Sequence, residues 1–487
     1  MKRTPDRSRA SGSWLEIARY PGLLTTESES GWLPDLIYTA GEFRSGLAMF
    51  ADSAGNITRF SPTPAHLAPD DLAKVQRLPG KALLPGQVNG HSHAFQRVLR
   101  GRTEHRTGAD RDSFWTWREK MYHAANRLEP EDVYHASRMA FLEMLLGGIT
   151  TVGEFHYLHH APGGIPYADR NELAWQVLRA ARDSGLRIAL LRTAYARSGW
   201  RKPAEPAQAR FLTPSVEDFI DDTENLRKAL EHREEAGKAW VGVAPHSLRA
   251  VPLDYLRPAI AYARERQMPV HMHVSEQPAD VEACVAEYHT RAVELLDRDG
   301  LLDARFTAVH AIHVTGEEIS ALARAGAMVC ACPTTERNLG DGAVPADQLW
   351  SAGVRISLGS DSNVQINLLE DARSLEYHLR MLKLERAVLG ARHLFSCATE
   401  SGAASLRAPG GSLEVGRPAD FFTVALDDPS LAGADFDSLL GHIVFSAERT
   451  AVRDVAVGGQ FVIRDGHHPL AEEIVNQFSR LQKNLWR

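Results

Sequence analysis

Two histidines two residues apart, His91 and His93, follow a short apolar run and a Pro85-Gly86 turn in the segment LLPGQVNGHSH. If this segment is extended, alternate side chains share one face, so both imidazoles point the same way and can bind one metal ion. An isolated pair of this kind is more often structural, with one ring packed and the other solvated. A metal site therefore requires further ligands from other parts of the chain.

Alternating strands and helices are the elements that would position such ligands. Apolar runs predict strands at 82–88, 149–156, 186–194, 240–245, 269–274, 305–311, 326–332 and 354–359. These runs are nearly continuous, as in parallel strands that are covered on both faces. Helical periodicity lies between them, for example over 131–148 and 171–185, and both of these segments end at glycine. Eight such units predict an α/β protein with a (β/α)8 barrel, and a doubly wound open sheet is the alternative.

Both ends of the chain have β character instead. Short strand-like segments lie between 36 and 84 and again after residue 400, where Gly458-Gly459 indicates a hairpin. We expect residues 31–84 and 397–487 to form one small β-sandwich beside a barrel domain at 85–396. The first 30 residues, which are basic and rich in serine, are expected to be a disordered tail.

The composition limits the classes of partner. The chain has 487 residues, and its 55 basic and 62 acidic side chains give a net charge of −7. We therefore expect no binding to nucleic acid or to an anionic membrane. No apolar run of about 18 residues predicts a transmembrane helix. Four scattered cysteines suit a reducing compartment, and we expect a cytoplasmic protein.

Histidines and carboxylates gather at the predicted strand ends, where barrels of this kind place their chemistry. They are His91, His93, Glu154, His156, His246, His273, Glu276, His310 and Asp361. A random scatter of 21 histidines would not place so many of them there. Neutral imidazoles with one carboxylate and an open position are typical of a catalytic metal site.

We predict His91, His93, His273 and Asp361 as the metal ligands. His271 shares a face with His273 but lies deeper along its strand. One Zn²⁺ per chain suits this set, and Fe²⁺ is also compatible. Such a metal would lower the pKa of a bound water towards neutrality.

The remaining polar groups predict the proton transfers. Asp361 could accept the proton of the water, and Glu276 could pass it to a leaving nitrogen. His310 could hydrogen-bond the nucleophile or the developing charge, whereas His313 lies in the following loop. The predicted chemistry is hydrolysis at the trigonal carbon of an amide or amidine.

The motifs PGQVNGHSHAFQR, HVSE, VHAIH and LGSDSN resemble the amidohydrolase superfamily. The resemblance implies a barrel flanked by a sandwich that is built from both ends of the chain. Superfamily members with two metals usually carry a lysine at the end of the fourth strand. Here that end reads VGVAPHS, so the resemblance implies a single metal. One departure is Gly90, which stands where a bulkier residue is expected.

Within the superfamily, the segments GHSHAFQR, DSFWTWREKMY, GEFHYLHH and HSLRAV resemble the formimidoylglutamate deiminase family of histidine degradation. The resemblance implies a homodimer acting on a small dicarboxylate substrate, N-formimidoyl-L-glutamate. Arg118 and Arg249 can each fork onto one carboxylate. Gln96 and Tyr157 could complete these clamps, and His246 could line the reacting end.

Two other functions remain open at this point. One is a mononuclear deaminase that acts on a purine or an aminated heterocycle, which would require aromatic stacking and no paired arginines. The other is a non-catalytic scaffold, which would normally have lost some of the metal ligands. His159 and His160, further along GEFHYLHH, are expected to be solvated loop residues.

Overall fold

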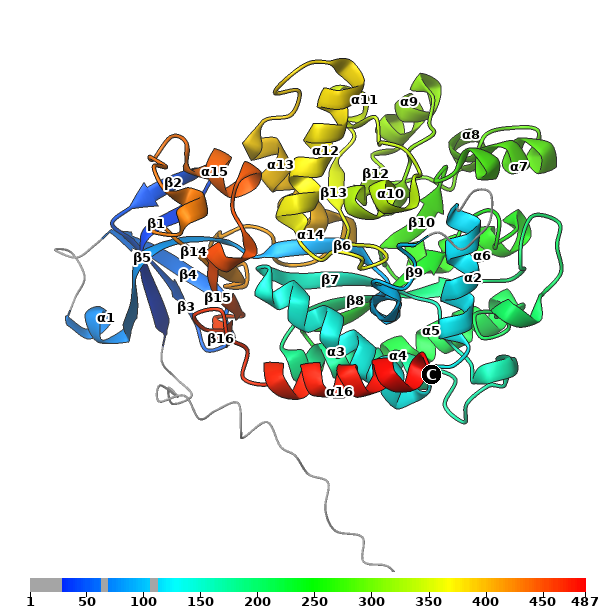
Figure 1. Cartoon of the computed structure of the whole chain (residues 1–487), viewed down its shortest axis with the longest axis horizontal. Helices are drawn as coiled ribbons and strands as arrows, with labels where there is room; N and C mark the ends of the chain where they lie inside the picture. The colour runs from blue at the N-terminus through cyan, green and yellow to red at the C-terminus, as the bar shows by residue number, and fades with distance from the viewer. Residues whose placement is uncertain (1–28, 63–68, 106–112) are drawn as a thin grey trace, which may run out of the picture.

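The computed structural model describes residues 29–62, 69–105 and 113–487, and Figure 1 shows two adjoining β-structures with helices around the larger one. Most of the predicted N-terminal tail lies outside the described residues, and Ser30 already belongs to the first strand. None of the helices in the described ranges is both long and apolar enough to cross a membrane.

The larger structure is a barrel of eight parallel strands, as predicted. In chain order and spatial order the strands are β6 (Gln87–Ser92), β7 (Ile149–His156), β8 (Arg187–Ala194), β9 (Ala239–Pro245), β10 (Val270–Val274), β11 (Phe306–His310), β12 (Met328–Ala331) and β13 (Ile356–Leu358). The chain just beyond β13 returns to β6, where Ser92 and Asp361 form a parallel bridge. This bridge closes the sheet into a barrel.

Helices follow the strands and cover the outside of the barrel (Figure 1). They are α2 (Phe114–Ala125), α3 (Pro130–Leu146), α4 (Glu172–Ser184), α5 (Val216–Leu230), α6 (Leu253–Glu265), α7 (Pro278–Tyr288), α8 (Ala292–Arg298), α9 (Gly316–Ala325), α10 (Pro333–Leu339), α11 (Ala346–Ser351), α12 (Leu368–Lys383), α13 (Ala391–Ala398) and α14 (Glu400–Leu406). The sequence signals at their ends act as expected. Thr315 caps α9 in a capping box, and α4 ends at Gly185, which has a left-handed φ of 85°.

The two ends of the chain form a second, mixed sheet. Its strands run in the order β16 (Gln460–Ile463), β15 (Val452–Val457), β14 (Phe421–Ala425), β5 (Val75–Pro85), β1 (Ser30–Thr39), β3 (Leu47–Ala51) and β4 (Ile57–Pro62), and β2 (Glu42–Ser45) pairs with β1. Strands from both ends of the chain come together in one structure, as expected. The described strands form one continuous sheet. Two short helices, α1 (Pro69–Lys74) and α15 (Leu439–Phe445), accompany it.

The strand predicted at 82–88 is wrong in one respect, because it is two strands in two different sheets. Leu83 and Leu84 lie in β5 and pair with β1 and β14, and the barrel begins only at Gln87. Pro85 has no N–H with which to continue a ladder. Gly86 then passes so close to β7 that an added Cβ would lie 2.2 Å from Thr150 Oγ1.

The C-terminal helix α16 (Ala471–Leu485) lies along α3 and supports the loop that follows β6 (Figure 1). Gln482 Nε2 and Trp486 Nε1 both donate to the carbonyl oxygen of Val98, at 3.0 and 3.3 Å. Val98 belongs to the 3-10 helix η2 (Ala94–Leu99), which directly follows His93. The end of the chain thus fixes the segment that carries the predicted residue Gln96.

The junction between the two sheets is testable. We expect Gly86→Ala to lower the free energy of unfolding by about 1–3 kcal/mol, because the new methyl group overpacks against Thr150. Adding Thr150→Ala should restore part of the loss. Gly316→Ala is the control, since nothing lies within 4 Å of its Cβ position. Urea unfolding measures all three changes, and a Gly86→Ala protein as stable as wild type would contradict the packing argument.

Candidate metal centre and substrate pocket

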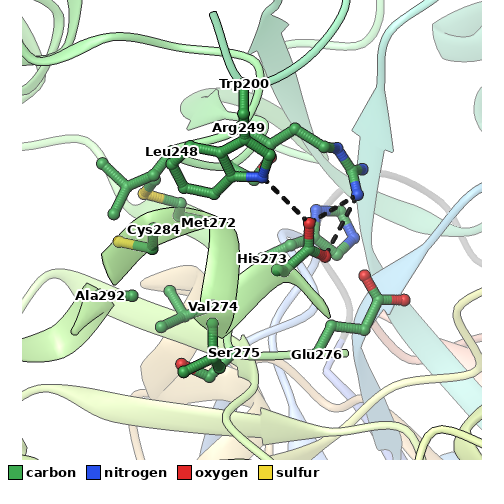
Figure 2. A pocket seen from close by; sticks show the side chains of 13 residues that line it. Trp200, Leu248, Arg249, Met272, His273, Val274, Ser275, Glu276, Cys284 and Ala292 are labelled. Carbon is green, nitrogen blue, oxygen red and sulfur yellow. Dashed lines mark hydrogen bonds and ion pairs between the residues drawn. The ribbon is translucent and has the colours of Figure 1, made fainter. Parts of the chain in front are cut away.

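The ends of β9 and β10 bring several predicted residues together. Figure 2 shows His273 and Glu276, at and just beyond the end of β10, beside Arg249 from the loop after β9. His273, Glu276 and Arg249 are all buried. The strand-end rule therefore places a histidine, a carboxylate and a guanidinium at one edge of the barrel.

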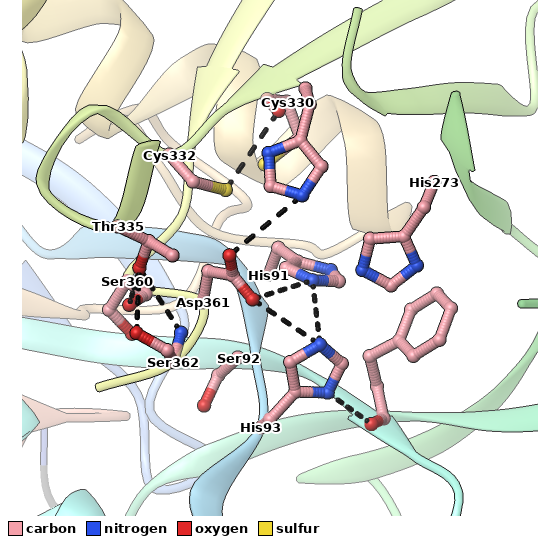
Figure 3. A network of polar contacts seen from close by, with 12 residues as sticks. His91, Ser92, His93, His273, Cys330, Cys332, Thr335, Ser360, Asp361 and Ser362 are labelled. Carbon is pink, nitrogen blue, oxygen red and sulfur yellow. Dashed lines mark hydrogen bonds and ion pairs between the residues drawn. The ribbon is translucent and has the colours of Figure 1, made fainter. Parts of the chain in front are cut away.

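The four predicted metal ligands lie within reach of a single ion. One ligand atom from each of His91, His93, His273 and Asp361 lies within 4.8 Å of the others. The Nε2 atoms of His91 and His93 are 3.2 Å apart, and Asp361 Oδ1 lies 3.5 and 3.3 Å from them (Figure 3). His271 lies deeper, as expected, and its Nε2 donates to the carbonyl of Ser405.

The chemistry of these side chains fits a divalent cation. Burial lowers the pKa of His91 to about 3 and holds the pKa values of His93 and His273 below their ordinary value. Burial would raise the pKa of Asp361, but the His91 contact and the nearby His310 lower it instead. Neutral imidazoles and an ionised carboxylate are the forms that bind metals.

Hydrogen bonds fix the orientation of two of the rings. Nδ1 of His93 donates to the carbonyl oxygen of Phe155 at 2.9 Å, and Nδ1 of His273 donates to that of His246 at 3.0 Å. Each bond leaves the Nε2 lone pair directed to the centre of the cluster, as in known metal sites. His91 Nδ1 has no partner among the described residues.

The barrel closes through the same residues that form the cluster. The N–H of Asp361 donates to the carbonyl of His91 at 3.0 Å, and the N–H of His93 donates to the carbonyl of Asp361 at 2.9 Å. Next to these bonds, the side chain of Asn89 binds Ser360, and that of Asn363 binds Ser92 and the His93 carbonyl. His91, His93 and Asp361 are therefore held at a fixed spacing.

Gly90 is explained by the same closure. A Cβ at this position would lie 3.1 Å from Cys330 Sγ, 3.1 Å from Ser357 Oγ and 3.2 Å from the carbonyl of Leu358. Glycine thus lets β6 approach β12 and β13 where the barrel closes. The departure from the superfamily pattern changes packing below the metal ligands and leaves the ligands in place.

Some residues at this edge of the barrel have an unusual backbone conformation. Ser275, His310 and Asp361 have positive φ angles of 51°, 71° and 46°, which non-glycine residues rarely adopt. Conformations of this kind cost about 1–3 kcal/mol each and persist where the surrounding structure enforces them. Their position next to the cluster is typical of a functional site.

Glu276 and His310 lie next to each other beside the cluster. His310 Nε2 lies 3.6 Å from Glu276 Oε1 and 3.8 Å from Asp361 Oδ2, and its Nδ1 contacts Glu336 at 3.2 Å. Burial raises the pKa of Glu276 to about 7. Burial alone would lower the pKa of His310, but Glu276, Glu336 and Asp361 raise it to about 10. Burial and the neighbouring carboxylates thus shift the pKa of Glu276 upwards, and the carboxylates do the same to that of His310.

One pocket contains nearly all of the remaining predicted residues. It is lined by His93, Gln96, Arg118, Tyr157, His246, Arg249, His273, Glu276 and Asp361, together with Phe114, Trp117, Met121, Tyr122, Tyr195, Phe211 and Leu339. Gln96 Nε2 donates to the hydroxyl of Tyr157 at 2.6 Å. Arg118 Nη1 and Arg249 Nε are buried without hydrogen-bond partners among the described residues. Two buried guanidinium nitrogens without partners indicate an anionic ligand.

Sequence reasoning missed the apolar wall of this pocket. Tyr195 directly follows β8, so the strand-end rule could have found it. Phe211 comes from an irregular connection, for which the sequence carries no periodic signal, and Leu339 is the last residue of α10. The expectation for His159 and His160 was wrong: both are buried, and their Nε2 atoms donate to the carbonyls of Thr193 and Leu212.

A closed parallel barrel with a buried His₃Asp cluster at the carboxyl ends of its strands is the architecture of a metal-dependent hydrolase. The chain belongs to the amidohydrolase family, whose family model matches residues 82–462.

Curated relatives and solved structures include several amidohydrolases. The chain is 39% identical to a formimidoylglutamate deiminase from Pseudomonas aeruginosa, over 86% of this chain and 93% of that protein. It is 29% identical to a 5-methylthioadenosine/S-adenosylhomocysteine deaminase from Natronomonas pharaonis, over 83% and 87% of the two chains. An amidohydrolase structure from Brucella melitensis superposes with a TM-score of 0.86 at 36% identity, over 94% and 100% of the chains.

The barrel closure generates a prediction for metal affinity. Asn363→Gly removes the side chain that binds Ser92 and the His93 carbonyl, and glycine tolerates the local φ of 56°. We expect metal affinity to fall about 10–100-fold, as for other residues that orient metal ligands. Competition with a chromophoric chelator measures the change.

Asn367→Gly is the matched control for this experiment. Asn367 caps α12 close to the same loop but does not contact the barrel closure. This variant should cost a few tenths of a kcal/mol in stability and leave metal affinity unchanged. Equal losses of metal affinity in both variants would count against a specific role for Asn363.

Proposed function

We propose that the protein is a metal-dependent deiminase that hydrolyses N-formimidoyl-L-glutamate to N-formyl-L-glutamate and ammonia. The observation that carries this proposal is the pair of guanidinium groups, Arg118 and Arg249, in the pocket beside the His₃Asp cluster. The substrate has one amidine carbon and two carboxylates, so it matches a pocket with two cationic clamps. The similarity to the deiminase from Pseudomonas aeruginosa supports the same reaction.

We infer that the metal is one Zn²⁺ held by His91, His93, His273 and Asp361. Three imidazoles and one carboxylate are ligands that zinc accepts, and an adenosine deaminase structure from Xanthomonas campestris with the same fold contains bound zinc. A bound zinc ion would lower the pKa of a water towards neutrality and polarise the amidine.

The chain's own groups would then move the protons. Asp361 lies at the cluster with one oxygen, Oδ2, turned towards His310, so it can accept a proton from the attacking water. Glu276 has a pKa of about 7 because it is buried, and it can carry a proton to the departing nitrogen. His310 can stabilise charge at the reacting carbon through Nε2, which has no hydrogen-bond partner among the described residues.

A purine or heterocycle deaminase is the second candidate, because Trp117, Tyr122 and Phe211 line the pocket and could stack on a ring. The arginines argue against it, since a neutral base would leave the buried nitrogens Arg118 Nη1 and Arg249 Nε without hydrogen-bond partners. Ammonia release from N-formimidoyl-L-glutamate, from other formimino and guanidino acids, and from adenosine derivatives distinguishes the two. Release from adenosine derivatives alone would overturn the proposed substrate.

Replacing either arginine tests the dicarboxylate clamp. We expect Arg118→Met or Arg249→Met to lower kcat/KM for N-formimidoyl-L-glutamate at least ~30-fold, because losing one partner of a buried charge pair costs about 2–5 kcal/mol. Lys120→Met is the control, since Lys120 lies on the same helix as Arg118 and, among the described residues, donates a hydrogen bond to the carbonyl of Arg102. Unchanged turnover in both arginine variants would refute the dicarboxylate assignment.

Replacing Glu276 tests the proton transfer. Glu276→Gln keeps the size of the side chain but cannot carry the proton, so we expect kcat to fall about 10²–10⁴-fold. Metal content, measured by elemental analysis, should stay at the wild-type level because Glu276 lies outside the ligand cluster. A variant that retains most of its kcat would assign the proton transfer to another group.

A further inference from the structure

We propose that Asp280 is a positioning residue that fixes Arg249 for one carboxylate of the substrate and thereby determines selectivity for dicarboxylates. Asp280 lies in the first turn of α7, four residues after Glu276. It belongs to neither the metal cluster nor the pocket wall that contains Arg118. This inference rests on the proposed function, because it specifies how the same site recognises its substrate.

The contacts of Asp280 with Arg249 and Trp200, both labelled in Figure 2, are the basis of this role. Arg249 Nη1 lies 3.2 Å from both carboxylate oxygens of Asp280. The indole Nε1 of Trp200 donates to Asp280 Oδ1 at 3.4 Å and holds the carboxylate from the other side. Arg249 is 5% exposed, so the pair is shielded from solvent and geometrically restricted.

The contact engages only one nitrogen of the guanidinium group. Arg249 Nε is buried without a partner among the described residues, and both hydrogen bonds to Asp280 use Nη1. The Nε–Nη2 edge is therefore left for a second carboxylate. A side-on fork through these two nitrogens is a common bidentate arrangement between arginine and a carboxylate.

Asp280 makes this edge available at a low entropic cost. A free arginine side chain loses about 2 kcal/mol of rotamer entropy when it is fixed by a ligand. The bond to Asp280 fixes it before the ligand arrives, which is preorganisation of the binding site. Asp280 also offsets the charge of Arg249. Arg249 would therefore orient the substrate carboxylate more than it would attract the substrate from a distance.

Arg118 is held in a different way. Its guanidinium carbon lies 4.8 Å from the ring centre of Trp115 and 5.2 Å from that of Tyr122, and within the described ranges no carboxylate forms an ion pair with it. Trp115 also lies 5.7 Å from the guanidinium carbon of Arg249, so one indole contacts both clamps. The charge of Arg118 is thus uncompensated, and only Arg249 depends on a neighbouring carboxylate for its orientation.

Asp280→Asn tests the proposal, because asparagine keeps the shape but removes the charge. The substrates are N-formimidoyl-L-glutamate and two analogues that each lack one carboxylate, N-formimidoyl-4-aminobutyrate and N-formimidoyl-L-2-aminobutyrate. We expect kcat/KM for the full substrate to fall at least ~10-fold, mainly through KM. For the analogue without the carboxylate bound by Arg249, the variant and the wild type should agree within about twofold, and the other analogue should respond like the full substrate.

A merely structural role would give a different pattern. If Asp280→Asn lowers kcat/KM equally for all three compounds, or for none of them, the proposal is overturned. Glu282→Gln is the matched control, since Glu282 is exposed on the same helix and loses the same charge. This control should behave like the wild type with every compound.

A binding measurement separates this inference from the proposed function. If the wild type releases no ammonia from N-formimidoyl-L-glutamate, the proposed reaction is wrong, and calorimetry with glutarate still reports on the clamp. Asp280→Asn should weaken glutarate binding to the metal-loaded enzyme at least ~10-fold while leaving butyrate binding within about twofold of wild type. Equal glutarate affinities in variant and wild type, or no glutarate binding by the wild type, would overturn the role of Asp280.

Discussion

The hydrogen bonds that close the barrel are the interaction on which the rest of the site depends. Asp361 exchanges backbone hydrogen bonds with His91 and His93, so the last strand segment is joined to the first strand at the ligands themselves. Closure therefore sets the distance between the carboxylate and two imidazoles. The positive φ of Asp361, 46°, is a local cost that the closed barrel enforces. The hydrogen bonds that close the barrel therefore also bring three of the four predicted ligands together.

Burial then determines the protonation states that the chemistry needs. It disfavours the charged form of the ligand histidines and keeps their pKa values low, and the same burial raises the pKa of Glu276 to about 7. The pKa of His310 is raised instead, because three carboxylates surround this ring. Burial thus lowers the pKa values of the clustered histidines and raises that of Glu276, and neighbouring charges modify these shifts.

The parts of the site that follow from strand periodicity could be predicted from the sequence. His273 and Asp361 could be identified from the sequence because the carboxyl ends of parallel strands meet at one edge. The change of sheet between Leu84 and Gln87 could not be predicted, because an apolar run does not show that the chain passes from one sheet to the other at Pro85-Gly86. His159 and His160 look like solvated loop residues in sequence. They are buried because the chain near Arg210 folds back and pairs with their backbone. Contacts between loops produce no periodic pattern in the sequence, so they could not be predicted from it.

Asp280 illustrates a further limit of sequence reasoning. An acidic residue in the first turn of a helix is favoured by the helix dipole alone, so its presence at the start of α7 requires no partner. Only the structure shows that this carboxylate engages Arg249 and leaves Arg118 without an ionic partner in the described part of the chain. The two arginines, both predicted as carboxylate clamps, therefore differ in their ionic partners. Arg249 is oriented by Asp280, which offsets its charge, whereas Arg118 has no carboxylate partner among the described residues.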